Sequence, residues 1–198
     1  MKKILFLILL SIPVLTFAQD APQLPVLPID SATKQITYKA IVEVPGVTAA
    51  DIYSRSREWF ATAFKSANSV LQMDDKAAGK LIGKGVFMHS YLIKAGFGVT
   101  APMSYTIGFT INVTVKEGKY RVIITDFTGT NTSPGAASTS GSLETLYTNA
   151  DSFKKMTGKM NKQVYGIFVQ MFTDVDTDTK ATIANLQKAV ITKVKDDF

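Results

Sequence analysis

Two alternating segments separated by only two residues, Glu117 and Gly118, constrain the fold of this chain more than any other feature. From Tyr105 to Lys116 apolar residues occupy every second position, and they do so again from Lys119 to Thr125. This alternation is typical of strands that bury one face and expose the other. The sequence therefore predicts two antiparallel strands joined by a tight turn, with Gly118 providing the positive φ that such turns require.

The register of this hairpin follows from the positions of its apolar residues. With a two-residue turn, each apolar residue on the inner face of one strand meets an apolar residue of the other. A shift of one residue would move the whole apolar set to the solvent face, so we expect burial to specify the register strongly. The predicted pairs are Val115 with Tyr120, Val113 with Val122, and Ile111 with Ile124.

Before this hairpin, the pattern predicts a strand followed by an amphipathic helix. Residues 34–44 alternate, and Pro45-Gly46 ends the strand. Thr48 is a suitable N-cap for a helix from Ala49 to about Ala67, whose apolar residues recur at helical spacing. The chain's one tryptophan, Trp59, lies on that apolar stripe, so we expect it to anchor the core rather than stack on a ligand.

The remaining segments complete an α+β pattern. A helical phase runs from about Asn161 almost to the end, either as one long helix or as two helices that break near Asp174–Asp178, and the continuous phase favours one. Glycines at 83 and 85 in the third strand indicate a bulge or a close backbone approach. The other expected segments are strands at 69–74 and 81–93, a loop at 95–102, a flexible loop at 129–142 and a helical turn at 143–147. The predicted fold is an antiparallel sheet with helices on one face, in the order β-α-β-β-β-β-α.

The N-terminus has the features of a secretory signal peptide, residues 1–18. Lys2 and Lys3 precede a short apolar run, and Thr16-Phe17-Ala18 provides small residues for cleavage. The apolar run is shorter than the roughly 20 residues that span a bilayer, so we expect cleavage and no transmembrane segment in the mature chain. A proline-rich extended lead-in follows at 19–29, and residues 30–198 are expected to form a single domain. The expected location is the periplasm or the extracellular space.

Composition excludes several classes of function. The chain has no cysteine, which excludes disulfides, thiol catalysis and cysteine-ligated metals. Loss of Lys2 and Lys3 with the signal peptide lowers the formal net charge from +6 to +4. We expect no nucleic-acid partner, because this charge is small and is spread along the chain, and because the protein is expected to be exported.

Three separated blocks resemble a known family. They are the segment from Leu27 to about Phe64, KLIGKG at 80–85, and VKEGKYRVIITDF at 115–127. In this order they resemble a bacterial family of secreted domains of unknown function that is described as having a TATA-box-binding-protein-like (TBP-like) fold. The resemblance implies that fold, but it implies no catalytic residues, and fold alone does not carry function.

Each residue that could take part in catalysis or metal binding also has a simpler structural explanation. His89 is the one histidine, and no GxSxG motif accompanies it, so a hydrolase would rest on this residue alone. Asp174, Asp176 and Asp178 resemble the start of a calcium loop, but Thr179 and Asn185 stand where such a loop needs glycine and glutamate. A solvated acidic helix face or a helix cap explains them more simply. We expect no cofactor and no metal.

A basic cluster precedes these aspartates in the sequence. Its members are Lys154, Lys155, Lys159 and Lys162. Such a cluster could touch an anionic envelope surface, although a solvated face is the simpler interpretation.

The hypothesis that these observations favour is an exported, non-enzymatic binding domain. The sheet face without helices would present Thr110, Asn112, Arg121 and Ile123, with Thr114 and Thr125 beside them. Mixed polar and apolar groups on an open sheet suit a partner protein, a glycan, an envelope component or a second copy of the chain. The alternative is a carrier of a small apolar molecule, in a cavity between sheet and helix lined by Phe87, Tyr91 and Phe168.

Overall fold

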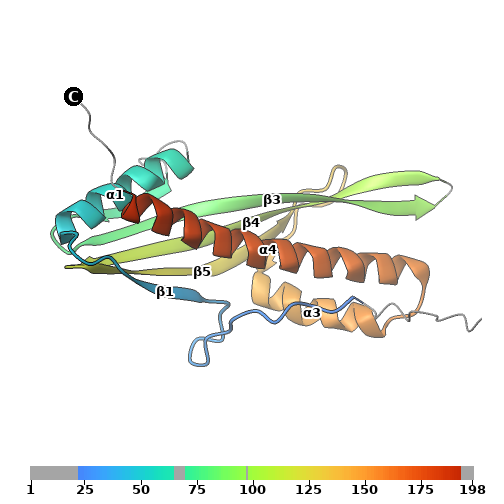
Figure 1. Cartoon of the computed structure of the whole chain (residues 1–198). Helices are drawn as coiled ribbons and strands as arrows, with labels where there is room; N and C mark the ends of the chain where they lie inside the picture. Colours follow the sequence, from blue (N-terminus) through green and yellow to red (C-terminus); the bar gives the residue numbers. More distant parts are fainter. Residues whose placement is uncertain (1–21, 65–69, 97, 193–198) are drawn as a thin grey trace, which may run out of the picture.

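The computed structural model describes residues 22–64, 70–96 and 98–192, so the predicted signal peptide lies outside the described residues. A long antiparallel sheet forms one layer, and the helices cover one of its faces (Figure 1). The strands are β1 (Tyr38–Glu43), β2 (Leu71–Asp75), β3 (Lys80–Gly96), β4 (Val99–Lys116), β5 (Lys119–Asn131) and β6 (Ser140–Ser142). The helices are α1 (Ala49–Ala63), α3 (Leu143–Lys155) and α4 (Lys159–Ile191). The strand order is β1-β5-β4-β3-β2, with β6 pairing β5. The predicted α+β class is confirmed.

The predicted hairpin register is confirmed between β4 and β5. Val115 pairs with Tyr120, Val113 with Val122, and Ile111 with Ile124. Gly118 has φ +66°, as the turn requires. All six of these side chains are buried, so burial of one face sets the register.

The helix α1 begins as its sequence predicts. The Thr48 side chain accepts a hydrogen bond from the backbone N–H of Asp51 at 3.1 Å, which caps the first turn. The helix ends at Ala63, and residues 65–67 of the predicted helix lie outside the described residues. Trp59 is 6 % exposed and contacts Phe60 and Phe64 edge-on, so the prediction of a core anchor is confirmed.

The two strand glycines allow α1 to approach the sheet closely. A Cβ atom on Gly83 would lie 2.7 Å from the ring of Phe60, and one on Gly85 would lie 2.7 Å from the ring of Phe64. Both contacts are too short for any side chain at these positions. Of the two sequence-based expectations, the close approach is therefore what the structure shows. Its cause is the ring of Phe60 on α1 at Gly83, and the rings of Phe64 at the C-cap of α1 and Phe109 of β4 at Gly85.

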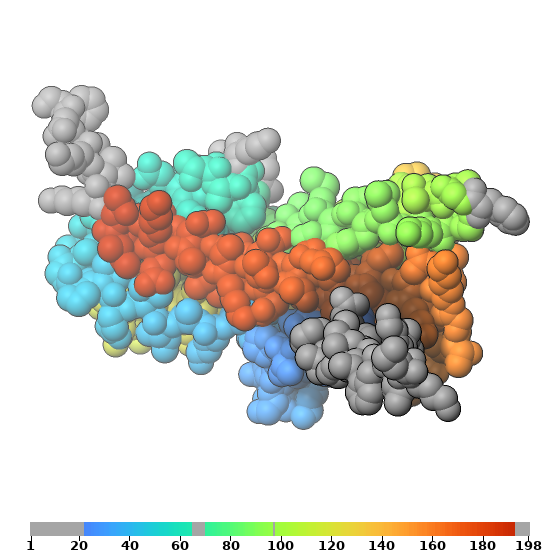
Figure 2. Space-filling model, turned by 45° about the vertical axis from the view of Figure 1, so that its right-hand side comes forward, coloured from blue at the N-terminus to red at the C-terminus, as the bar shows by residue number. Residues whose placement is uncertain are grey.

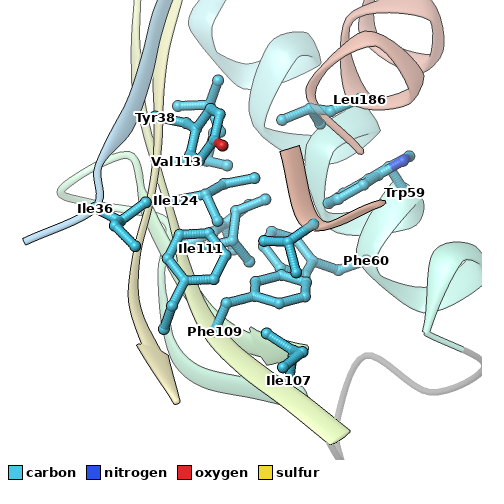
Figure 3. Packing of buried hydrophobic residues seen from close by; sticks show 14 of the residues in the cluster. Ile36, Tyr38, Trp59, Phe60, Ile107, Phe109, Ile111, Val113, Ile124 and Leu186 are labelled. Atoms are coloured by element: carbon cyan, nitrogen blue, oxygen red, sulfur yellow. The ribbon is translucent and has the colours of Figure 1, made fainter. Parts of the chain in front are cut away.

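One continuous apolar core lies between the inner sheet face and the helices (Figure 3). Ile107, Ile111 and Val113 of β4 are fully buried there, together with Phe60 of α1 and Leu186 of α4. These residues come from strands and helices far apart in the sequence. The inner face is therefore filled by packing between the sheet and both α1 and α4.

The helix α4 runs unbroken through Asp174–Asp178, as the continuous phase predicts. In the space-filling view it crosses the molecule beneath α1 and the β3–β4 hairpin (Figure 2). Within the part of the chain that the structure describes, no helix is long and apolar enough to span a bilayer.

Two predicted loops are wrong in extent. In place of a loop at 95–102, β3 and β4 continue as a long hairpin, with Gly96 paired to Val99. The flexible loop predicted at 129–142 is shorter, because Gly129–Asn131 belongs to β5, and Ser140–Ser142 forms β6, which pairs with residues 128–130 of β5. The local Gly/Ser/Thr composition does not predict a strand here, but hydrogen bonding to the backbone of a neighbouring strand orders the segment.

The N-terminal lead-in is also more than a spacer in its described part, residues 22–29. Leu27 is 4 % exposed in the core, and the carbonyl of Pro25 accepts a hydrogen bond from the Tyr147 hydroxyl at 2.8 Å. Tyr147 belongs to α3, a full helix where the sequence predicted only a turn. The lead-in therefore lies along α3 (Figure 1).

Candidate functional site

The candidate site is the sheet face opposite the helices, which we call the open face. Its residues come from alternate positions of four strands, so they share one side of the sheet. They are Lys39, Ile41 and Glu43 of β1, Lys119, Arg121, Ile123 and Thr125 of β5, Thr110, Asn112, Thr114 and Lys116 of β4, and Lys80, Ile82 and Lys84 of β3.

The strand register brings the four predicted site residues together. Asn112 lies directly opposite Ile123, and Thr110 lies opposite Thr125. Arg121 is flanked by Thr114 on β4 and by Ile41 on β1. The structure thus places Thr110, Asn112, Arg121 and Ile123 in adjacent rows of one surface, as the hairpin analysis predicted.

A shallow hollow of about 310 Å³ lies at the turn end of the open face. Three cations, Lys116, Lys119 and Arg121, line it together with one acid, Glu43, and with Ile41, Thr114 and Tyr120. Ile41 is 62 % exposed, so the hollow offers an apolar contact beside its positive charges. This arrangement suits an acidic group carried on a partly apolar surface.

Positive charge dominates the open face. Its cations are Lys39, Lys80, Lys84, Lys116, Lys119 and Arg121, whereas Glu43 and the edge residue Asp75 are its acids. Only one ion pair joins described residues of this face, between Lys119 and Glu43 at 3.8 Å. The other cations of this face are in no ion pair with a described residue.

Sequence reasoning missed part of this face. Ile41 and Lys39 of β1, and Lys80 and Lys84 of β3, lie beside the predicted residues in the sheet. Their outward positions follow from the same alternation that defines β4 and β5. What the alternation does not indicate is which strands are neighbours, so the extent of the charged surface required the strand order.

Aromatic side chains are absent from the open face among the described residues, because those on the strands occupy inner-face positions. Tyr38, Phe87, Tyr91, Tyr105 and Phe109 all belong to the helix-covered side. The described residues of this face thus provide none of the aromatic stacking platforms used to bind single-stranded nucleic acid.

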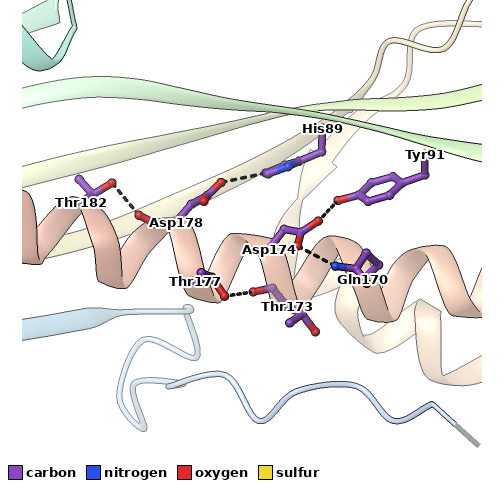
Figure 4. A network of polar contacts seen from close by, with 8 residues as sticks. All are labelled: His89, Tyr91, Gln170, Thr173, Asp174, Thr177, Asp178 and Thr182. Atoms are coloured by element: carbon purple, nitrogen blue, oxygen red, sulfur yellow. Dashed lines mark hydrogen bonds and ion pairs between the residues drawn. The ribbon is translucent and has the colours of Figure 1, made fainter.

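The three aspartates of α4 form a row of contacts with the inner sheet face, and Figure 4 shows two of them, Asp174 and Asp178, pointing toward Tyr91 and His89. Asp174 accepts a hydrogen bond from the Tyr91 hydroxyl at 2.8 Å, and Asp176 accepts one from the Tyr38 hydroxyl at 2.9 Å. The Oδ2 atom of Asp178 lies 3.4 Å from Nε2 of His89. The interpretation of these aspartates as a solvated face or a cap is therefore wrong, because they attach α4 to the sheet.

This environment keeps the two tyrosines protonated. Burial raises the pKa of Tyr91, and the hydrogen bond and charge of Asp174 raise it further. Burial likewise raises the pKa of Tyr38, with a further contribution from Asp176. A neutral hydroxyl donating to a carboxylate is a stable structural contact at ordinary pH.

The metal and hydrolase alternatives gain no support from this row. Each aspartate contacts a different protein group, and the described residues contain no cluster of three or more His, Cys, Asp or Glu that could hold a metal. His89 is mostly covered, and its Nε2 atom has no hydrogen-bond partner among the described residues. A serine hydroxyl activated by His89 would require such a bond.

A second polar cluster ties α1 to the edge of the sheet. Asp74 of β2 accepts hydrogen bonds from the Tyr53 hydroxyl and from Nε of Arg57, the latter at 2.6 Å. These two donors lower the pKa of Asp74. Because each carboxylate oxygen accepts a hydrogen bond from a side chain of α1, the cluster connects α1 to β2.

The residues proposed to line a carrier cavity pack against protein. Phe87 stacks on Phe109 with ring centroids 4.5 Å apart, and Phe168 contacts Tyr105 and Phe153. Tyr91 is held by Asp174. Each of the three side chains therefore has a protein partner in the described structure.

The antiparallel sheet with helices on a single face defines the class of this protein as an α+β domain. Residues 38–129 match the family model described as "Domain of unknown function (DUF4468) with TBP-like fold", which confirms the resemblance indicated by the sequence. The matched region spans β1 to most of β5, so it contains the whole of the open face.

Two solved structures are similar to this chain. A crystal structure of a DUF4468 family protein from Bacteroides ovatus has 17 % identity and a TM-score of 0.49, with 79 % of this chain and 89 % of that chain covered. A crystal structure of a TBP-like protein from Parabacteroides distasonis has 10 % identity and a TM-score of 0.49, with 81 % and 97 % covered. No curated protein matches the sequence.

Proposed function

We propose that the protein is an exported, non-enzymatic binding module whose open face receives the acidic surface of a partner protein in the cell envelope. One observation carries the proposal. The helices α1 and α4 cover the same sheet face. The other face presents six cations, and among the described residues Lys119 is the one cation of this face that is in an ion pair. An unneutralised basic surface steers and orients an acidic partner.

Site-specific photo-crosslinking tests this proposal. Because the chain has no cysteine, an introduced cysteine is the single position that a thiol-reactive label can modify. Ile41→Cys places a benzophenone label on an exposed open-face position beside Arg121. After incubation with envelope extract of the bacterium that makes the protein, we expect a discrete adduct. Its yield should fall as salt is raised, because screening weakens exposed charge pairs.

Two further variants make the result specific. Adding Arg121→Glu to the labelled protein should lower adduct yield about tenfold, since a cation that attracts the partner becomes an anion that repels it. The matched label at Ser54→Cys, on the exposed side of α1, should give no discrete adduct. Equal adducts from both labels, or a yield that Arg121→Glu leaves unchanged, would remove the open face as the binding surface.

A further inference from the structure

A second basic surface lies at the end of the molecule where the β3–β4 hairpin turns. Figure 1 shows this turn beside the connection between α3 and α4. Lys159 of α4 lines one hollow of about 310 Å³ together with Lys94, Val99 and Thr100 of the hairpin. The backbone N–H of Lys94 also donates to Oε1 of Gln163 at 3.0 Å. We call this region the hairpin end.

Acidic residues are missing from both parts of the chain that meet there. Residues 76–116 contain no aspartate or glutamate, and neither do residues 152–173. The basic cluster noted in the sequence is thus joined by Lys94 in space. The cations of the hairpin end are Lys94, Lys154, Lys155, Lys159 and Lys162, and none of them is in an ion pair with a described residue.

Large apolar side chains project from the same end. Leu92 is 74 % exposed and Val99 is 58 % exposed on the hairpin. Met156 and Met160 are about half exposed, and in the sequence they alternate with the lysines as KKMTGKMNK at 154–162. Figure 2 shows the hairpin and the first turns of α4 projecting together at this end. The surface is therefore a projecting tip that combines free cations with exposed aliphatic groups.

We propose that the hairpin end docks peripherally on an anionic lipid bilayer, a role separate from partner binding by the open face. Lysines near an anionic membrane each attract it, and exposed aliphatic side chains add affinity by entering the interfacial layer. Lysine stems can lie along apolar surface while their ammonium groups reach lipid phosphates. An acidic protein would need a complementary concave surface for this tip, whereas a bilayer accepts a projecting tip directly.

Vesicle sedimentation with the purified protein tests this. We expect binding to vesicles of phosphatidylcholine with about one third phosphatidylglycerol, and little binding to phosphatidylcholine alone. Lys154→Glu with Lys155→Glu should weaken binding at least about tenfold, since two attractive charges become repulsive. The matched control, Lys76→Glu with Lys188→Glu, changes the net charge equally outside the hairpin end and should bind like the parent protein. Thermal unfolding of each variant verifies folding.

An environment-sensitive NBD label distinguishes lipid insertion from general charge attraction. On anionic vesicles, NBD at Leu92→Cys or Met156→Cys should shift to shorter wavelength, while NBD at Ser54→Cys should not. Arg121→Glu should leave vesicle binding intact, so this surface can be judged independently of the open face. Equal vesicle binding by the Lys154/Lys155 variant and its control would overturn the proposal. Binding to soluble polyphosphate without an NBD shift on vesicles would overturn it in favour of an acidic polymer.

Discussion

At the scale of single residues, the least expected feature is a buried hydroxyl. Tyr120 is 1 % exposed on the inner face, where it pairs with Val115, and its hydroxyl has no hydrogen-bond partner among the described residues. Burial raises the pKa of Tyr120 to about 12. The ring fills the core, but the oxygen costs free energy because it loses water without gaining a partner.

We therefore expect Tyr120→Phe to leave stability unchanged or to raise the free energy of unfolding by about 1 kcal/mol. The variant keeps the ring and removes the unpaired hydroxyl. Urea unfolding at pH 8 measures this difference, and a loss of more than about 1 kcal/mol would show that the hydroxyl has a partner.

The same variant has a predicted pH dependence. The folded-state pKa of Tyr120 lies above the unfolded value of about 10, because the buried hydroxyl resists ionisation. The stability that depends on the protonated hydroxyl is therefore fully present below pH 10 and is lost as pH rises through about 12. Tyr120→Phe should lose less stability than the parent protein between pH 10 and 12. Urea midpoints across this range provide the test, and identical losses would contradict the raised pKa.

At the scale of elements, α4 is held by both apolar packing and directed polar contacts. Its apolar stripe fills the core, while Asp174, Asp176 and Asp178 reach Tyr91, Tyr38 and His89 on the sheet. Two of these contacts are hydrogen bonds, from Tyr91 of β3 and from Tyr38 of β1, and the third is the approach of Asp178 to His89 of β3. The polar row therefore joins α4 to two separate strands of the sheet.

The contact between Tyr91 and Asp174 should be energetically coupled. Tyr91→Phe is expected to lower the free energy of unfolding by about 1–2 kcal/mol, because it removes a hydrogen bond to a charged acceptor. In a double-mutant cycle with Asp174→Ala, we expect a coupling energy of about 1 kcal/mol. Strict additivity would show that the bond contributes nothing to docking of α4.

At the scale of the whole molecule, the folding unit exceeds the matched family region. Residues 38–129 contain most of the sheet and α1, but α4 supplies Met171, Phe172, Val175 and Leu186 to the core. On the N-terminal side of the matched region, Leu27 of the lead-in is buried, and the backbone N–H of Ile36 donates a hydrogen bond to Glu144 of α3 at 2.8 Å. The sheet is therefore covered only when both flanking segments are present.

This arrangement predicts that a fragment of residues 38–129 does not fold cooperatively. Removal of α4 would expose a large apolar surface, and buried apolar area is the main source of stability for a domain of this size. Far-ultraviolet circular dichroism and amide NMR dispersion of the fragment measure this, with residues 22–192 as the control. A well-dispersed, cooperatively unfolding fragment would contradict the prediction.

The sequence by itself determined the features that depend on local periodicity. The register around Gly118, the cap at Thr48, the burial of Trp59 and the continuity of α4 all follow from patterns within one or two adjacent elements. Alternation also identified the outward positions of Arg121 and Ile123. Such patterns are reliable because one-sided burial leaves a single arrangement in which every apolar residue is covered.

Only the tertiary structure decided which distant segments meet. It paired the Gly/Ser/Thr segment at 140–142 with β5, turned Asp174–Asp178 toward the sheet, and brought Lys94 beside Lys159. These outcomes depend on strand order and on how far the β3–β4 hairpin extends, which no local period encodes. The physical reason is that charged and polar groups take their partners from whatever packing places nearby, whereas apolar periodicity records only which side of an element is buried.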